Sequence, residues 1–116
     1  MRILPFHLSH APDASDGGIA IAVAELITAQ QTVGLDPAWL TADRFRPRQR
    51  DRELRRAVAS QAPQLLHIHG LWRSSTRIAA DFSSVGFPMV IAPHGMLDAG
   101  ALAISRRKKQ LVWHLW

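Results

Sequence analysis

The sequence contains no cysteine among its 116 residues. This absence excludes disulfide frameworks, cysteine–zinc sites and thiol nucleophiles, and it fits a reducing compartment. The longest apolar run, 19–29, contains Glu25 and is far shorter than the roughly 20 residues that a membrane-spanning helix needs. The N-terminal run is also short and is broken by His7 and His10, which argues against a secretory signal peptide. We therefore expect a cytoplasmic protein.

The remaining composition is that of an ordinary globular domain. Apolar residues make up 47% of the chain and charged residues 20%, which argues against disorder and against fibrous repeats. The length fits a single domain that spans residues 1–116.

The net charge of +5 is concentrated in two segments. Residues 43–56 hold seven arginines against three acidic residues, and the second segment is Arg106, Arg107, Lys108 and Lys109. Such clusters indicate an anionic partner, either a phosphate, a nucleic acid or an acidic membrane surface. A solvated basic face is the plainer alternative. No nucleic-acid recognition motif is visible, so we expect no nucleic-acid partner. Peripheral contact with the inner face of the membrane remains open.

Apolar strands alternate with helical segments along the chain. We predict strands over 2–8, 35–41, 64–69 and 89–92, and helices over 18–33, 51–60, 73–85 and 102–116. Asp16 is the expected N-cap of the first helix, and Gly34 its expected end. Strands in this alternation pair in parallel through right-handed crossovers. The sequence therefore predicts an α/β fold with a Rossmann-like, open, doubly wound parallel sheet.

Ligands of such sheets bind at the carboxyl ends of the strands, and the first unusual loop there is Asp16-Gly17-Gly18. Two glycines let a ligand approach the backbone closely, and the N-terminus of the following helix offers free N–H groups to a phosphate. The pair matches neither a dinucleotide-binding fingerprint nor a P-loop. A tight turn is the structural alternative.

The second loop follows His67-Ile68-His69 and continues as Gly70-Leu71-Trp72. Alternate residues of a strand share a face, so His67 and His69 could share a metal ion. No third ligand stands at a characteristic spacing, and we expect no metal. We expect His69, at the strand end, to face a ligand and His67 to be a hydrogen-bonded core residue. Trp72 is either an apolar wall for a sugar ring or part of the core.

The third loop is Pro-His-Gly-Met-Leu-Asp at 93–98. His94 directly follows a buried strand, where the catalytic groups of α/β folds are found. An imidazole at this place can hydrogen-bond a substrate hydroxyl or carry a proton near neutral pH. A structural role in the loop is the alternative.

Together these motifs resemble glycosyltransferase family 4. The similarity rests on Gly17-Gly18 before an Ala/Val-rich helix, on the 69–72 and 93–98 motifs, and on Lys108-Lys109 before an apolar segment. The resemblance implies the N-terminal, acceptor-side half of a GT-B fold. It also implies a retaining transferase that takes a nucleotide-sugar donor and a glycan or lipid-linked acceptor, with no metal or other cofactor.

By position, the resemblance places Gly17 and Gly18 at the donor diphosphate and His94, as the catalytic residue, beside the transferred sugar. His69 and Trp72 fall on the acceptor side. The sequence departs from the family pattern at Gln64, where an aspartate is common, and after the 93–98 motif, where Pro-Trp is frequent. The donor-binding C-terminal domain is absent from the sequence. We therefore expect a fragment that is inactive alone, or a non-catalytic subunit that pairs with a separate donor-domain chain.

Overall fold

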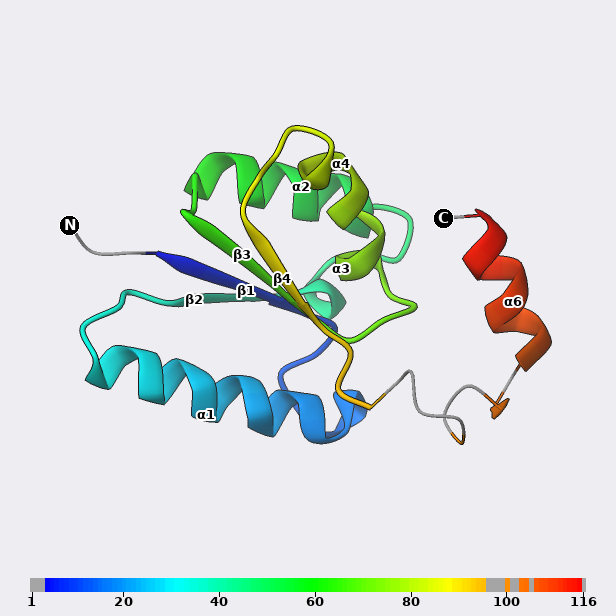
Figure 1. Cartoon of the computed structure of the whole chain (residues 1–116), viewed down its shortest axis with the longest axis horizontal. Coiled ribbons are helices and arrows are strands. Elements are labelled where there is room, and N and C mark those ends of the chain that lie inside the picture. The colour runs from blue at the N-terminus through cyan, green and yellow to red at the C-terminus, as the bar shows by residue number, and fades with distance from the viewer. Residues whose placement is uncertain (1–3, 96–99, 101–102, 105, 116) are drawn as a thin grey trace.

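The computed structural model describes residues 4–95, 100, 103–104 and 106–115. Within these residues four strands form one parallel sheet in the order β2-β1-β3-β4 (Figure 1). The strands are β1 (Pro5–Ser9), β2 (Ala38–Thr41), β3 (Leu65–His69) and β4 (Met89–Ala92). The helices are α1 (Gly18–Thr32), α2 (Arg50–Gln61), α3 (Ser74–Arg77), α4 (Ala79–Ser83) and α6 (Arg106–Leu115). The prediction of an α/β fold with a parallel sheet is confirmed.

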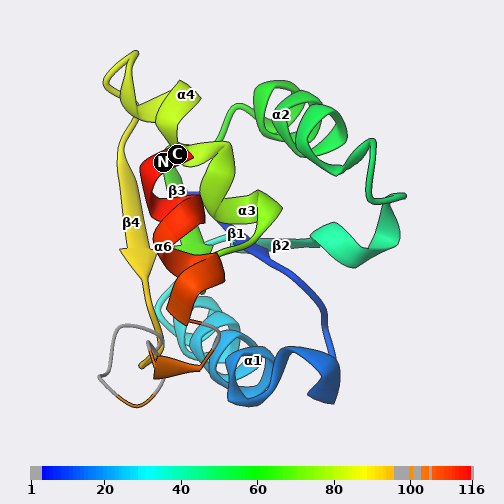
Figure 2. The same cartoon turned by 90° about the vertical axis from the view of Figure 1, so that its right-hand side faces the viewer.

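Helices cover both faces of the sheet, as a doubly wound arrangement requires. The long helix α1 lies on one face, and α2, α3 and α4 lie on the other (Figures 1 and 2). The helix predicted over 73–85 is interrupted, because Ile78 separates α3 from α4. Ile78 itself is buried beneath the break, which anchors this segment to the sheet in spite of the irregular backbone.

The first helix begins at Gly18, as predicted, but its N-cap lies one residue later than predicted. Gly17, not Asp16, is the N-cap of α1, so that prediction was wrong. The Asp16 carboxylate instead accepts hydrogen bonds from the backbone N–H groups of His10 and Ala11, at 3.2 and 3.3 Å. It ties the short 3-10 turn Ala14–Asp16 to the end of β1. The helix ends before Gly34, which has φ of +86°.

The apolar core lies between the sheet and the helices α2, α3 and α4. Register partners in a parallel sheet share a face, so Phe6 and Leu66 point to this side together, as do Leu8 and Ile68. Burying one large aliphatic side chain contributes roughly 1.5–3 kcal/mol, so this side contributes most of the stability. The core residues are Phe6, Leu8, Leu40, Ala42, Leu54, Val58, Leu66, Ile68, Ile78 and Ala79.

The opposite side of the same strands carries polar rings. His7 is in register with Trp39 on one neighbouring strand and with His67 on the other. Trp39 Nε1 donates a hydrogen bond to Ser9 Oγ at 2.9 Å. The α1 face of the sheet is therefore held partly by hydrogen bonds between side chains, whereas the other face is purely apolar.

The last described helix, α6, stands apart from the sheet, on the side of the molecule where the strands end (Figure 1). The helix was predicted from residue 102, but residues 101, 102, 105 and 116 lie outside the described part of the chain. None of the described helices combines the length and the apolar character needed to cross a bilayer.

Candidate functional site

The strand order places the expected ligand crevice at the carboxyl ends of β1 and β3. From β1 the chain moves to β2 on one side, and β3 then returns to the other side of β1. In an open α/β sheet, the crevice beyond the carboxyl ends of two such strands is where ligands bind. The three loops singled out by sequence follow β1, β3 and β4. Parallel pairing brings them to one edge of the sheet.

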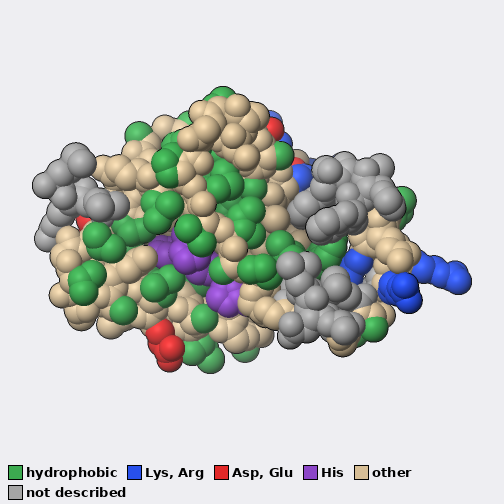
Figure 3. Space-filling view, in the orientation of Figure 1, with side chains coloured by type: hydrophobic (Ala, Val, Ile, Leu, Met, Phe, Trp, Pro, Cys, Tyr) green, Lys and Arg blue, Asp and Glu red, His purple; other side chains and the backbone are tan. Residues whose placement is uncertain are grey.

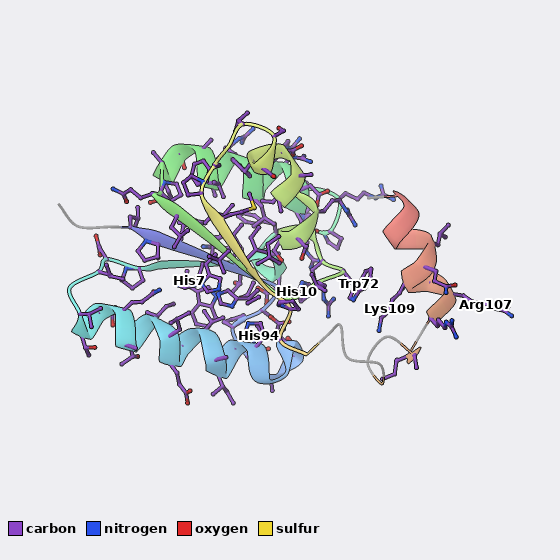
Figure 4. All side chains as sticks on the ribbon, in the orientation of Figure 1. His7, His10, Trp72, His94, Arg107 and Lys109 are labelled. Carbon is purple, nitrogen blue, oxygen red and sulfur yellow. The ribbon has the colours of Figure 1, made fainter. Side chains whose placement is uncertain are left out.

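A row of imidazoles connects the strands near this edge. His7 Nδ1 lies 2.9 Å from His69 Nε2, and His69 Nδ1 lies 2.9 Å from His94 Nε2. At the other end of the row, His7 Nε2 is 2.7 Å from Gln30 Oε1 on α1. An amide oxygen only accepts, so His7 Nε2 carries a hydrogen and its Nδ1 accepts one from His69. His69 Nδ1 then accepts the Nε2–H of His94 (Figure 4 labels His7 and His94).

His67 joins the row by stacking. Its ring lies 4.1 Å from that of His69 and 5.1 Å from that of His7, measured between centroids. Burial, reinforced by the neighbouring imidazoles, lowers the pKa of His67 to about 4 and that of His69 to about 3. Burial also lowers the pKa of His7, although its hydrogen bond to Gln30 opposes the shift. At pH 7 these three rings are neutral.

The burial of the two β3 histidines is the opposite of what we expected. His69 is only 2% exposed and its ring nitrogens face His7 and His94, whereas His67 is half-buried. The reason lies in the register. His67 is paired with Val90 of β4, which is 45% exposed, so solvent reaches this part of the face. His69 lies deeper, between two other imidazoles.

His7 was missed as a site residue. Its only sequence signal was a polar side chain inside an apolar first strand. Alternation within one strand can indicate that His67 and His69 share a face. It does not reveal that β1 contributes a third ring, because that depends on the register between strands distant in the sequence.

Gly17 and Gly18 border an open hollow of about 420 Å³, lined also by 12–14 and by one side of α1. Apart from the adjacent residues and the backbone of α1 itself, no atom lies within 4 Å of where a Cβ would stand on either glycine. Gly17 has φ of +61° and ψ of −142°, a conformation that favours glycine. The backbone at the start of α1 is therefore accessible to a ligand of the size of a phosphate.

Two arginines approach the end of β1. The pKa of His10 is lowered first by burial and then by the positive charges of Arg73 and Arg50, while nearby carboxylates oppose the shift. Arg50 is held in place because its Nε donates to the carbonyl oxygens of Ala42 and Phe45, both at 3.1 Å. Sequence analysis did not single out Arg73, although it directly follows Trp72. The two cations lie close to the carboxylates of Asp16 and Asp43, so positive and negative side chains are both present where β1 ends.

Trp72 and His94 share an unusual backbone. Their φ angles are +63° and +51°, in the left-handed region that residues with a side chain rarely occupy. Such strain persists where the surrounding structure fixes it, often at functional sites. Trp72 is half-buried and His94 is exposed.

The predicted basic patch lies on α6, on the side of the molecule where the strands end. Arg106, Arg107 and Lys108 are exposed on α6 and Lys109 is half-buried, and basic side chains project from that end of the molecule (Figure 3). In the other basic segment, Arg55 pairs with Asp81, and Asp51 pairs with Arg77 at 3.1 Å. Part of that segment therefore links α2 to α3 and α4.

Comparisons with family models, with characterised proteins and with solved structures give no match to this chain. The geometry of the site alone therefore bears on its function, and the resemblance to glycosyltransferases stays a prediction.

Proposed function

We propose that this chain forms the acceptor-side domain of a retaining, nucleotide-sugar-dependent glycosyltransferase of the GT-B type. One observation carries the proposal. The three loops whose motifs resemble that family follow parallel strands, so their first residues lie at one edge of the sheet. Two of the loops are joined directly, because His94 of the third is hydrogen-bonded to His69 at the start of the second.

The chemistry available at this edge suits a sugar diphosphate. At the open start of α1 the backbone N–H of Gly18 can donate a hydrogen bond to a phosphate oxygen, whereas that of Gly17 already donates to the carbonyl of Ala14. Arg50 and Arg73 lie near the end of β1, beside the carboxylates of Asp16 and Asp43. Preorganised donors of this kind stabilise the charge that develops on a leaving diphosphate.

The sugar would be positioned by His94 and Trp72. Because His94 Nε2 is engaged with His69, its Nδ1 is left to accept a hydrogen bond from a sugar hydroxyl. The indole of Trp72 provides an apolar wall for the sugar ring, and the backbone of Trp72 is held in a strained conformation. In this arrangement His69 is a positioning residue that acts through His94.

The test is binding, because the chain is expected to be inactive alone. We would record amide NMR spectra of the ¹⁵N-labelled chain with UDP-sugars, GDP-sugars and the free nucleoside diphosphates at millimolar concentration. We expect the largest shifts at Gly17 and Gly18. Gly18→Val should abolish them, because its side chain enters the hollow.

Ala59→Val is the matched control, since Ala59 is exposed on α2, across the sheet from α1. This variant should keep the shifts. The proposal is contradicted if none of these compounds perturbs the two glycines of the wild-type chain, or if Gly18→Val binds as well as the wild type.

A further inference from the structure

Three histidines from two strands converge on one point of the α1 face. One ring nitrogen from each of His7, His67 and His69 lies within 4.8 Å of the other two. We propose that these three imidazoles bind a divalent transition-metal ion, with Zn²⁺ as the favoured ion. This site shares His69 with the proposed sugar site, but the argument for it does not rest on the glycosyltransferase function.

The spacing of the nitrogens is close to that of a zinc site. Tetrahedral Zn²⁺ with bonds of about 2.0–2.1 Å holds its ligand nitrogens about 3.4 Å apart. His7 Nδ1 and His69 Nε2 face each other at 2.9 Å, so they need to separate by only about half an ångström to admit the ion. The His67 ring, half-buried and stacked on His69, can close from the third side.

The nitrogens that face away from the ion already have partners. His7 Nε2 donates to Gln30 Oε1, and His69 Nδ1 faces His94 Nε2. Metal-binding histidines usually engage their second nitrogen in this way, which fixes the ring and its tautomer. When His69 Nε2 binds the ion, its hydrogen moves to His69 Nδ1, which then donates to His94 Nε2. The hydrogen of His94 moves to its Nδ1, so in the metal-bound form this nitrogen donates a hydrogen bond instead of accepting one. The number of bound protons does not change.

The ligand type and the access also fit. All three groups are imidazoles, which bind a metal ion through a ring nitrogen that carries no hydrogen. Nitrogen ligands without carboxylates favour zinc, copper or nickel over magnesium or calcium. The exposed Val90 beside His67 leaves a path from solvent. Three protein ligands and an accessible fourth position are typical of zinc sites that bind water or substrate.

The simplest alternative is that the rings form only a hydrogen-bonded row. To distinguish a metal site from a hydrogen-bonded row, we would titrate the chelator-treated chain with Co²⁺ at pH 7.5 and monitor visible absorption. Zn²⁺ would then be added as a competitor. We expect one ion per chain, a tetrahedral Co²⁺ spectrum that Zn²⁺ abolishes, and a higher thermal midpoint with Zn²⁺ because the ion binds the folded state.

Two matched pairs of variants locate the site. His67→Ala, at a half-buried position that folding should tolerate, is expected to weaken binding at least tenfold, and His10→Ala to leave it unchanged. Gln30→Ala should weaken binding about 10- to 100-fold, as the loss of such an outer partner commonly does. Gln31→Ala, on the exposed side of α1, should have no effect.

The proposal is overturned if the wild-type chain binds no metal at micromolar concentration. It is also overturned if His67→Ala and Gln30→Ala both bind as tightly as the wild type. Either result leaves the nucleotide-sugar experiment untouched, because that experiment reads amide shifts at Gly17 and Gly18 without added metal.

Discussion

Gly17 and Gly18 are adjacent in the chain but make different demands on the backbone. Gly17 has φ of +61° with ψ of −142°, whereas Gly18 is the first residue of α1. Gly17→Ala should lower the free energy of unfolding by roughly 1–3 kcal/mol through backbone strain. Gly18→Ala should be neutral or raise it by about 0.5–1 kcal/mol, because alanine favours a helix and its Cβ would touch nothing. Urea unfolding of the two variants measures the difference. Equal effects would contradict the different backbone conformations that the structure assigns to Gly17 and Gly18.

The histidine row predicts that acid destabilises the metal-free protein. An imidazole in the unfolded chain has a pKa of about 6.5, whereas burial lowers that of His67 to about 4 and that of His69 to about 3. Between these values the unfolded chain binds more protons than the folded one. The stabilisation is therefore complete above the unfolded pKa and is lost as the pH falls below it.

Urea midpoints of chelator-treated protein at pH 7 and pH 5 test this expectation, since most carboxylates stay ionised over that interval. We expect a lower midpoint at pH 5. The decrease should be smaller in His67→Gln, which removes one titrating ring. A midpoint that does not change between the two pH values would show that the rings are not buried as described.

At the scale of the element, α2 ends on a strained residue. Ala62 has φ of 45° and ψ of 54°, and its N–H donates to the carbonyl of Val58. An alanine in this left-handed conformation costs roughly 1–2 kcal/mol, which glycine avoids. Ala62→Gly should therefore raise the thermal midpoint. Ala59→Gly, inside the same helix, should lower it because glycine costs about 1 kcal/mol there. If both variants destabilise the protein, the end of α2 differs from this description.

Local sequence signals located the elements but not their interruptions. The apolar run 64–69 and the run 89–92 predicted β3 and β4 because short apolar runs bounded by glycine and proline are typical of buried strands. The break at Ile78 had no such signal, since neither proline nor glycine stands there. Ile78 and Ala79 are both buried in the core at this break, and such tertiary contacts leave no mark in the local sequence.

Part of the candidate site could be predicted from the sequence, because its loops follow predicted strands. The loops after β1, β3 and β4 were identified from glycines and histidines next to strand ends, and a parallel sheet necessarily brings such ends together. The partners of those residues were not predictable. Gln30 meets His7 across 23 residues, and His7 meets His69 across 62. Contacts of this range depend on register and on the position of α1 over the sheet.

At the scale of the whole molecule, we expect the 116-residue chain to transfer no sugar by itself. Stabilising a leaving diphosphate requires a site shielded from water, and here Gly17, Gly18 and His94 are all exposed. Purified monomer would be assayed for transfer and for donor hydrolysis with several nucleotide-sugars. Turnover that follows the monomer through purification, and that Gly18→Val removes, would contradict this expectation.

The position of β1 in the sheet also bears on how the chain is made. This strand precedes the other three described strands in the sequence, yet it lies between two of them, and Phe6 can pair with Leu66 only after β3 has been synthesised. At about 5–20 residues per second, translation leaves β1 without β3 for several seconds. Helix α1 can form locally in that time, but parallel pairing over such a separation is slow. Until β3 has been made, the side of β1 that will pair with it stays open in the nascent chain, and chaperones that bind extended apolar segments would meet it there.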